Sequence, residues 1–510
     1  MNRRQYKKEL GKFKQNTISA VTGGYNAGSF RRAAFRNWTP GAGDANADTI
    51  DDLPALRARS RDLARNAPIG GAAINTLETN VIGTGLSMKS NPDARFLGWT
   101  EEQAAEWKRE VESEWLLFCC STDCDATQTY NFYGLQSLVY RSMRESGDVI
   151  ALTPMIQRRS PYSLAIQLVE ADRLCNKNYG ADTDEKIAGI TIDGNGSPVM
   201  YDIARAHPGA IRRKSLEWDE VPAFGANGRR NVLHLFHKKR PGQVRGIPYL
   251  APIIEHLKQL SRYSEAELQA AVVSAALAIF VKMDADAFES LFDGESKDKY
   301  LNNSMAWNGS VNMDIDGPGK AVNLLPGESV EVPDMGRPNS NYDPFFLSIL
   351  KQIGPALGMP FEVLIKHFSS SYSASRAALL DFGRMVRVER DFMETYFCEP
   401  IKDLWFEEAV SLGRINAPGF FADDRIKQAY TRVTWTGDSQ GSIDPEKEVS
   451  AAERRIALGI STIEKESILY DGGDWEANIT QRAKEKQLMD DLGLNDSGDV
   501  VNVPSMPPQS

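Results

Sequence analysis

The apolar residues first recur at helical spacing at Leu53, after a long N-terminal stretch without such a pattern. From there to residue 83 the pattern predicts two helices, separated at Asn66-Ala67-Pro68, because proline suits the first position of a new helix. Another helix is predicted after Thr100, which has the spacing of a capping box with Gln103. Its apolar positions are Trp107, Val111, Trp115 and Phe118. This face is predicted to lie in the core rather than to bind a ligand.

Between about residues 148 and 239 the spacing of apolar residues shifts toward two, which predicts strands. The predicted strands lie in "VIALTPMIQ", "LAIQLVEADRL", "AGITIDGNGSPVMYDIA" and "NVLHLFHKK", with "DGNG" as a hairpin turn. His234 and His237 fall on the last of them. Because residues three apart on a strand point to opposite faces, the two histidines are not expected to bind one metal ion together.

Helical spacing returns at about residue 249 and continues to about residue 283. A helix of that length would span roughly 45 Å. Its second half is rich in small residues, which suits packing between copies of the same helix as well as burial within one chain. The sequence alone leaves both alternatives open.

The next part of the chain alternates polar segments with helices. Residues 284–342 are rich in Asp, Asn, Ser and Gly, and contain one predicted hairpin with its turn at Pro326-Gly327. A helix is predicted over 342–358, followed by a loop over 359–374. A very long helix is predicted after this loop.

The two ends of the chain lack hydrophobic periodicity. Residues 1–36 contain nine lysine or arginine residues and a single acidic residue, Glu9. This composition predicts a flexible basic arm, and a merely solvated terminus is the alternative. The final stretch, "NDSGDVVNVPSMPPQS", is predicted to be disordered, because it has few apolar residues to bury.

The composition is that of a globular protein, with 42% hydrophobic and 25% charged residues among 510. The net charge of −10 disfavours a protein that neutralises nucleic-acid phosphates over its whole surface, but leaves room for a local basic feature. Five cysteines, three of them in "CCSTDC", fit a reducing compartment better than a disulfide framework, and their spacing is not that of a zinc site. No run of eighteen apolar residues occurs, so we expect no membrane-spanning helix and no secretion by the usual route.

No sequence motif supports an enzyme. The chain has no G-x-x-x-x-G-K-[ST] loop to hold nucleotide phosphates, and neither G-x-S-x-G nor H-E-x-x-H occurs. Two aspartate pairs, Asp284/Asp286 and Asp314/Asp316, could hold a magnesium ion, but a solvated surface fits their polar surroundings better. We therefore expect no enzymatic activity, no metal and no cofactor.

Several stretches, taken in order, resemble one known family. They are "RARSRDLARNAPIGGAAINTLETNVIGTGL", "NFYGLQSLVYRSMRESGDVIAL", "QLVEADRL", "VLHLFHKKRPGQVRGIPYLAPI" and "YSASRAALLDFGR". In this order they resemble the lambda-like portal proteins of tailed bacteriophages and prophages, from about residue 20 to about residue 480. The resemblance implies an α+β portal fold, with a mixed wing domain, a helical stem, a small α/β clip and long tunnel and crown helices, in a ring-forming oligomer.

The resemblance also implies a function. Portal proteins of this kind are virion structural proteins that form a ring, usually a homododecamer, at one capsid vertex, where they act as the head–tail connector and the channel for double-stranded DNA. The implied partners are the terminase large subunit, the major capsid protein or scaffold, and a head-completion protein, with assembly in the host cytoplasm and no membrane. The alternative is a portal-like chain with its own enzymatic activity, or a terminase motor component. The lack of a nucleotide-binding motif argues against the motor.

The resemblance divides the chain into nine segments. In chain order they are a flexible basic N-terminal arm (1–52), the wing (53–247), a first stem helix (248–283), the clip (284–341), a second stem helix (342–358), a tunnel loop (359–374), a long tunnel/crown helix (375–411), a C-terminal helical crown region (412–494) and a disordered tail (495–510).

The tunnel loop and the start of the next helix contain our candidates for contact with DNA. They are Lys366, His367, Ser369, Ser370 and Arg376. The basic side chains supply positive charge, the serines supply flexibility and hydroxyl donors, and the next helix, expected to begin near Ser373, would present its positive dipole end. Contacts to phosphate carry no base information, as a channel for arbitrary DNA requires. An ordinary surface loop between helices is the alternative.

Overall fold

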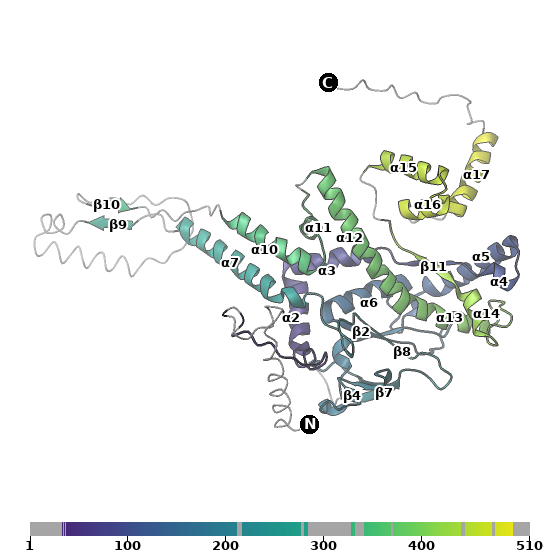
Figure 1. Ribbon diagram of the computed structural model, residues 1–510, viewed down its shortest axis with the longest axis horizontal. Coiled ribbons are helices and arrows are strands. Elements are labelled where there is room, and N and C mark those ends of the chain that lie inside the picture. The colour runs from purple at the N-terminus through teal and green to yellow at the C-terminus, as the bar shows by residue number, and fades with distance from the viewer. Residues whose placement is uncertain are drawn as a thin grey trace, which may run out of the picture.

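The structure is a computed structural model that describes most of the chain. The described residues are 33, 35, 37–211, 217–276, 280–283, 328–331, 341–368, 371–439, 444–471 and 475–492. Helices and short antiparallel sheets together form a central body, as expected of an α+β fold (Figure 1). Two paired helices, α7 (Ile254–Ala276) and α10 (Tyr342–Ala356), project from this body, and three C-terminal helices lie on another side of it (Figure 1).

The first half of the body is built on four helices. They are α2 (Leu53–Asn66), α3 (Pro68–Val81), α5 (Glu101–Cys119) and α6 (Phe132–Ser146). The break between α2 and α3 falls at Ala67, as predicted. Thr100 and Gln103 form the predicted capping box, and the four predicted apolar positions of α5 are buried. Proline at the first helical position and side-chain capping therefore located these boundaries correctly.

Two antiparallel sheets follow, with strand orders β3-β2-β8 and β4-β5-β6-β7. Their strands are β2 (Asp148–Leu152), β3 (Gln167–Glu170), β4 (Lys186–Ile187), β5 (Ile190–Ile192), β6 (Pro198–Ala204), β7 (Trp218–Pro222) and β8 (Val232–Phe236). All four predicted strand regions contain strands, whereas β4 and β7 were not predicted. Gly196 has a φ of +81° in the predicted turn, a conformation that glycine adopts without steric cost.

The two histidines predicted to lie on one strand have different surroundings, because only His234 belongs to β8. The Nε2 atom of His234, on β8, lies 3.1 Å from the carboxylate of Asp148. His237 follows β8, and its ring stacks on Phe392 with 4.1 Å between centroids, while its Nε2 atom lies 3.3 Å from the Glu389 carboxylate. Across the described ranges, no group of three or more His, Cys, Asp or Glu side chains could hold a metal ion.

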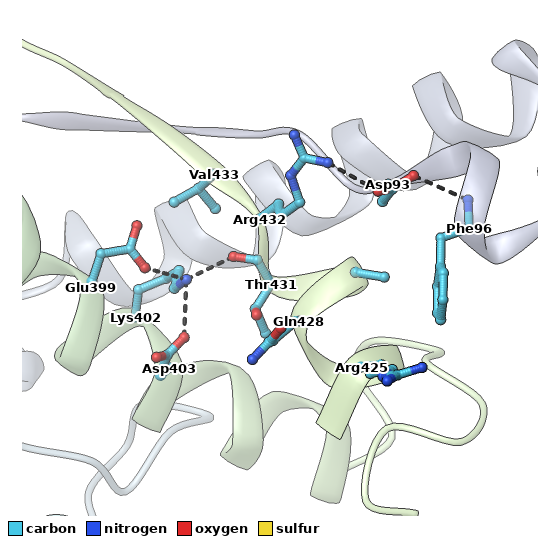
Figure 2. A pocket seen from close by; sticks show the side chains of 11 residues that line it. Asp93, Phe96, Glu399, Lys402, Asp403, Arg425, Gln428, Thr431, Arg432 and Val433 are labelled. Carbon is cyan, nitrogen blue, oxygen red and sulfur yellow. Dashed lines mark hydrogen bonds and ion pairs between the residues drawn. The ribbon is translucent and has the colours of Figure 1, made fainter. Parts of the chain in front are cut away.

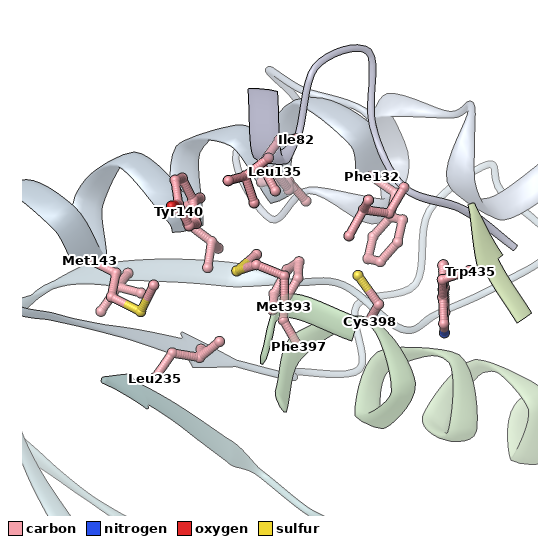
Figure 3. Close-up of a cluster of buried hydrophobic side chains, with 14 of the residues drawn as sticks. Ile82, Phe132, Leu135, Tyr140, Met143, Leu235, Met393, Phe397, Cys398 and Trp435 are labelled. Atoms are coloured by element: carbon pink, nitrogen blue, oxygen red, sulfur yellow. The ribbon is translucent and has the colours of Figure 1, made fainter. Parts of the chain in front are cut away.

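The main hydrophobic core forms where α6 meets the long helix of the second half. Figure 3 shows Phe132 and Tyr140 of α6 facing Met393 and Phe397 of that helix. The rings of Phe132 and Phe397 are stacked, with 5.7 Å between centroids. Trp435, from a later segment, closes one end of this cluster (Figure 3). The two halves of the chain therefore share one core.

The segment that contains Trp435 returns to the body after the long helix. α14 (Asp424–Thr431) lies beside α4 (Ala94–Leu97), and β11 (Val433–Thr436) pairs antiparallel with β1 (Ser87–Ser90). The region over 412–494 that was predicted to be helical therefore also contains a strand, β11. Its sequence, Val-Thr-Trp-Thr, suits a strand, but four residues are too few to show a clear period.

The first helix of the projecting pair is shorter than predicted. α7 ends at Ala276, and Phe280–Met283 instead form β9, which pairs antiparallel with β10 (Glu328–Glu331). The helix prediction is therefore wrong for these four residues, where the β-favouring Phe-Val pair continues the apolar run. The predicted turn at Pro326-Gly327 lies outside the described residues.

The second helix of the pair, α10, begins at the predicted residue and ends at Ala356, two residues before its predicted end. The ring of Tyr263 on α7 stacks on that of Tyr342 on α10, with 5.6 Å between centroids. The loop predicted over 359–374 is only partly a loop, because Phe361–Ile365 form the short helix α11. Burial of apolar side chains on the body stabilises this single turn, which is too short to be recognised from periodicity.

One long helix crosses the body, as predicted. It consists of α12 (Tyr372–Met393), a π-helical segment (Glu394–Cys398) and α13 (Glu399–Ser411). Pro400 has no N–H to donate, and its ring would meet the carbonyl four residues earlier in a regular α-helix. The wider π turn directly before it accommodates the proline without breaking the helix.

Three helices end the described chain: α15 (Pro445–Ala457), α16 (Ile463–Asp471) and α17 (Trp475–Asp491). Glu466 is the only buried residue among their described side chains. These helices therefore lack an apolar core of their own within one chain. The predicted tail over 495–510 lies outside the described residues, as do residues 1–32 of the predicted basic arm.

Asp148, the first residue of β2, is fully buried and has three charged or ionisable partners. Its carboxylate accepts hydrogen bonds from Arg57 of α2 at 2.7 Å and from Arg245 at 2.6 Å, and contacts His234. Burial opposes ionisation, but the two guanidinium groups outweigh it and hold the pKa of Asp148 well below its usual range. The carboxylate is therefore charged at neutral pH, deep inside the protein.

The variant Asp148→Asn should lower the free energy of unfolding by about 3–5 kcal/mol, because it leaves two buried guanidinium groups without a counter-charge. Urea unfolding at pH 7 would measure the loss. Asp219→Asn removes one carboxylate of an exposed pair with Arg205 and is the matched control, with an expected loss below about 1 kcal/mol. Equal losses of unfolding free energy in the two variants would show that the buried ion pairs of Asp148 stabilise the protein no more than an exposed pair does.

Candidate nucleic-acid interface

The candidate segment joins α11 to α12. In Figure 1 it lies at the end of α12 that is remote from the sheets. Of the five candidate residues, the structure describes Lys366, His367 and Arg376. Ser369 and Ser370 lie outside the described residues, so their contact with DNA stays a prediction.

Tertiary packing holds the base of this segment on the body. Val363 and Leu364 of α11 are buried in the main core. A Cβ atom at Gly354 would lie 2.8 Å from the carbonyl oxygen of Met359, so the turn between α10 and α11 requires a glycine there. The hydroxyl of Tyr249 donates to the carbonyl of Leu357 at 2.5 Å. The segment therefore starts from a rigid support.

Lys366 ends α11 in the left-handed conformation, with φ 54° and ψ 35°. This conformation costs an L-residue other than glycine about 1–2 kcal/mol. The side chain is exposed, and it forms no ion pair with the part of the chain that the structure describes. Strained residues of this kind occur often at functional positions, where the surrounding structure enforces them. Sequence spacing gave no indication of this backbone geometry.

Two exposed aromatic side chains lie on either side of the serine run 369–371, and sequence reasoning did not single them out. Phe368 is 47% exposed and Tyr372 is 49% exposed. His367 is also exposed, and its backbone N–H donates to the Glu362 carbonyl at 3.1 Å. The sequence could have identified these two aromatic residues, because both lie beside serines at positions where no predicted helical face places an apolar side chain in the core.

The N-terminus of α12 lies where the sequence placed it. The helix begins at Tyr372, one residue before the predicted Ser373. The hydroxyl of Ser371 accepts a hydrogen bond from the backbone N–H of Ala374 at 3.4 Å and caps the helix. The positive end of the helix dipole is therefore beside the candidate residues.

Arg376, in contrast, has partners within the chain. Its guanidinium lies 3.9 Å from the carboxylate of Glu448 on α15 and donates to the hydroxyl of Tyr372 at 3.4 Å. Its charge is therefore less available to DNA than that of Lys366. The sequence could not show this, because Glu448 lies on a separate helix far along the chain.

Polar anchors hold the other end of α12 in the body. Arg390 donates to the carbonyls of Asn80 at 2.8 Å and Val81 at 2.9 Å, at the C-terminus of α3. It also donates to the carbonyl of Asp438 at 2.7 Å. The neighbouring Glu389 forms an ion pair with Arg144 of α6. The candidate segment is thus carried at the end of a helix whose far half is immobilised.

A pocket of about 540 Å³ lies between α4, α13 and α14, away from the candidate segment. Figure 2 shows Lys402 within it, surrounded by oxygen atoms. The Lys402 ammonium lies 2.6 Å from the Glu399 carboxylate and 3.0 Å from that of Asp403, and donates to the carbonyl of Thr431 at 2.7 Å. An amine with three such partners is not a free nucleophile.

No helix among the described residues is both long and apolar enough to cross a membrane.

Comparison with known proteins decides the family. Residues 31–390, more than half of the chain, match the family described as phage portal protein, lambda family. The chain belongs to this family of portal proteins. The match covers the candidate segment and ends within α12, before the C-terminal helices.

Two relatives extend the similarity of this portal protein toward the C-terminus. Portal protein B of Escherichia phage lambda is 25% identical over 502 residues, which cover 95% of this chain and 93% of that protein. The portal protein of Escherichia phage N15 is 24% identical over 498 residues, or 94% and 93% of the two chains. The family predicted from the sequence is therefore confirmed.

The solved structures that resemble this portal protein are less similar to it in sequence than the two phage relatives. A chain from the neck of an empty gene transfer agent particle, computed with C6 symmetry, is 14% identical to this portal protein. The similarity covers 82% of this chain and 93% of that one, with a TM-score of 0.43. A TM-score this low does not establish a detailed structural correspondence.

The variants Lys366→Gly and Lys366→Ala both remove the charge of the portal protein's left-handed residue, but differ in backbone strain. Lys366→Gly should raise the free energy of unfolding by up to about 1 kcal/mol, whereas Lys366→Ala should leave it near that of the parent protein. Urea unfolding would compare the three proteins. An alanine variant as stable as the glycine variant would show that residue 366 is not strained in solution.

Proposed function

We propose that this portal protein forms a closed ring of twelve copies at one capsid vertex and that double-stranded DNA is packaged and ejected through its centre. The family match over residues 31–390 carries the proposal. The ring would be a structural part of the virion, assembled in the host cytoplasm, and would need no catalytic site, metal or cofactor of its own. Its proposed partners are the terminase large subunit, the major capsid protein or scaffold, and a head-completion protein.

Exposed apolar side chains support assembly into a ring. On α7, Leu268 is 67% exposed and Val272 is 53% exposed, and Phe345 of the adjacent α10 is 49% exposed. On α12, Leu380 is 60% exposed and Val388 is 67% exposed. Leu268 and Val272 lie one turn apart on α7, and exposed apolar surface of this kind is unfavourable in water and typical of contacts between subunits. Head-to-tail contacts between identical copies close into a ring when the rotation permits.

The segments of the portal protein keep their proposed roles with adjusted boundaries. We assign the stem to α7 and α10, the clip to the chain between them, and the tunnel segment to α11, the following loop and the start of α12. The crown would consist of α15, α16 and α17, because the chain from α13 to β11 packs into the body that would form the wing.

The tunnel segment is the proposed place of contact with DNA. Lys366 and His367 are exposed at its start, and the positive end of the α12 dipole lies just beyond it. The hydroxyls of Ser369 and Ser370 would add donors to phosphate. Arg376 has a lesser proposed role, because its guanidinium lies near Glu448. Each copy adds a net charge of −10, so most of the ring would repel DNA and limit adhesion elsewhere.

The purified portal protein should form particles with a central hole in negative-stain images, and with a mass close to twelve times that of one chain. The mass of the ring should be measured over a wide range of protein and salt concentration, because apolar contacts resist salt better than charged ones do. If only monomers and dimers occur over that whole range, the ring proposal is wrong. Hydrolysis of ATP or cleavage of DNA by the purified protein alone would support the enzymatic alternative instead.

Replacing Lys366 and His367 together with alanine should leave ring formation unchanged but alter the rate, yield or retention of packaged DNA. The reason is that two exposed groups facing phosphate are lost without disturbing the buried side of α11. An in vitro packaging assay would measure the effect. The double variant Lys238→Ala/Lys239→Ala removes exposed positive charge from the body and is the control. Normal packaging in the first variant would rule out the proposed contact.

A further inference from the structure

The C-terminal helices offer two exposed faces of opposite charge. One face belongs to α15 and consists of Glu446, Val449, Ser450, Glu453 and Ala457. The other belongs to α17 and consists of Ile479, Arg482, Lys486 and Met489. Apart from the adjacent Val449 and Ser450, successive residues of each face are three or four positions apart, so each set lies along one side of its helix. All of them are exposed in the single chain.

The acidic face of α15 points away from its own chain. The opposite side of α15 carries Glu448, which lies near Arg376 of α12, and Arg455, which donates to the Glu466 carboxylate of α16 at 2.8 Å and 2.5 Å. α15 therefore has an inner side with partners in its own chain. Val449 is 51% exposed, and the flanking Glu446 and Glu453 form no ion pair in the part of the chain that the structure describes.

The basic face of α17 is likewise uncovered. Ile479 is 49% exposed and Met489 is 47% exposed, with Arg482 and Lys486 between them. Neither basic residue forms an ion pair within the described residues. The two positive charges of this face would match the two negative charges that flank Val449 on α15. The same chain thus carries both halves of one complementary contact.

We infer that α17 of one copy docks against the outer face of α15 in the next copy of the ring. This inference rests on the ring proposed above and names a contact that would hold the C-terminal helices together around it. Because the two faces differ, the contact is head-to-tail, and such contacts propagate from copy to copy until the ring closes. DNA is a less suitable occupant, since α15, α16 and α17 carry more acidic than basic residues.

The contact would also give these helices the core that they lack. Within one chain Glu466 is their only buried residue among those described, so their apolar side chains remain in water. Docking would bury Val449, Ile479 and Met489 and place each charge beside an opposite one. The apolar contacts would supply most of the free energy, and the charges would determine which faces meet.

Charge reversal tests the contact. One variant carries Glu446→Lys and Glu453→Lys, a second carries Arg482→Glu and Lys486→Glu, and a third combines all four changes. In assembled rings of either of the first two variants, chymotrypsin should cleave α16 and α17 about ten times faster than in the parent, because like charges would meet and about 1.4 kcal/mol of protection would be lost. The combined variant should recover protection to within about threefold of the parent, because opposite charges meet again.

The variant Lys465→Glu/Lys484→Glu is the matched control, since it changes the net charge by the same amount as the second variant but lies off the basic face. It should be cleaved like the parent. Cleavage unchanged in both single-face variants, no recovery in the combined variant, or cleavage of the control as fast as that of the single-face variants would each overturn the contact. So would protection that arises only after capsid protein or DNA is added, because another partner would then cover these faces.

Mass measurement of the same samples separates this inference from the proposed function. If the parent protein forms rings and the reversals have no effect on cleavage, the docking of α17 on α15 is wrong while the ring stands. If the parent protein forms no ring under any condition, the proposed function itself fails.

Discussion

The architecture depends on one negative charge that is completely shielded from water. Asp148 is the point at which α2, the sheet containing β2 and β8, and the chain leading to α7 converge. Because an unpaired carboxylate is very unfavourable in such a site, Arg57 and Arg245 must both be close by, and this requirement determines where their backbones lie. The backbones at Gly147 and Gly246 approach so closely that no side chain fits between them. The chain continues from this buried cluster toward α7, the first of the two projecting helices.

The long helix that includes α12 and α13 is the second organising element. Its middle supplies Met393 and Phe397 to the shared core, while Arg390 joins it to α3 and to the chain beyond β11. The segment with Lys366 is attached to the free end of this helix. The proposed contact with DNA requires that the body determine the position of this segment, and a helix anchored over half its length provides that support.

Much of the fold could be predicted from local signals. Proline at position 68, the capping box at Thr100 and the spacing of apolar residues located helices correctly, because these effects act within a few residues. β11 could not be predicted in the same way, since it exists through pairing with β1, which lies more than three hundred residues earlier. β9 and α11 are also short elements whose partners come from other parts of the chain. The candidate site shows the same division: its charges were visible in the sequence, but the left-handed backbone of Lys366 and the proximity of Arg376 to Glu448 are consequences of tertiary structure.

The π-helical segment before Pro400 also changes the phase of the long helix. One residue more than a regular α-helix needs is taken up between Glu394 and Cys398, and an extra residue advances every later side chain by about 100° around the axis. A straight helix would have kept a single stripe of apolar residues facing α3 and α6 along its whole length. With the shift, the stripe rotates as it passes the π turn, so that Trp405 and Phe406 on α13 meet Trp115 and Trp107 on α5. A single inserted residue therefore allows one long helix to pack against α3 and α6 before the π turn and against α5 after it.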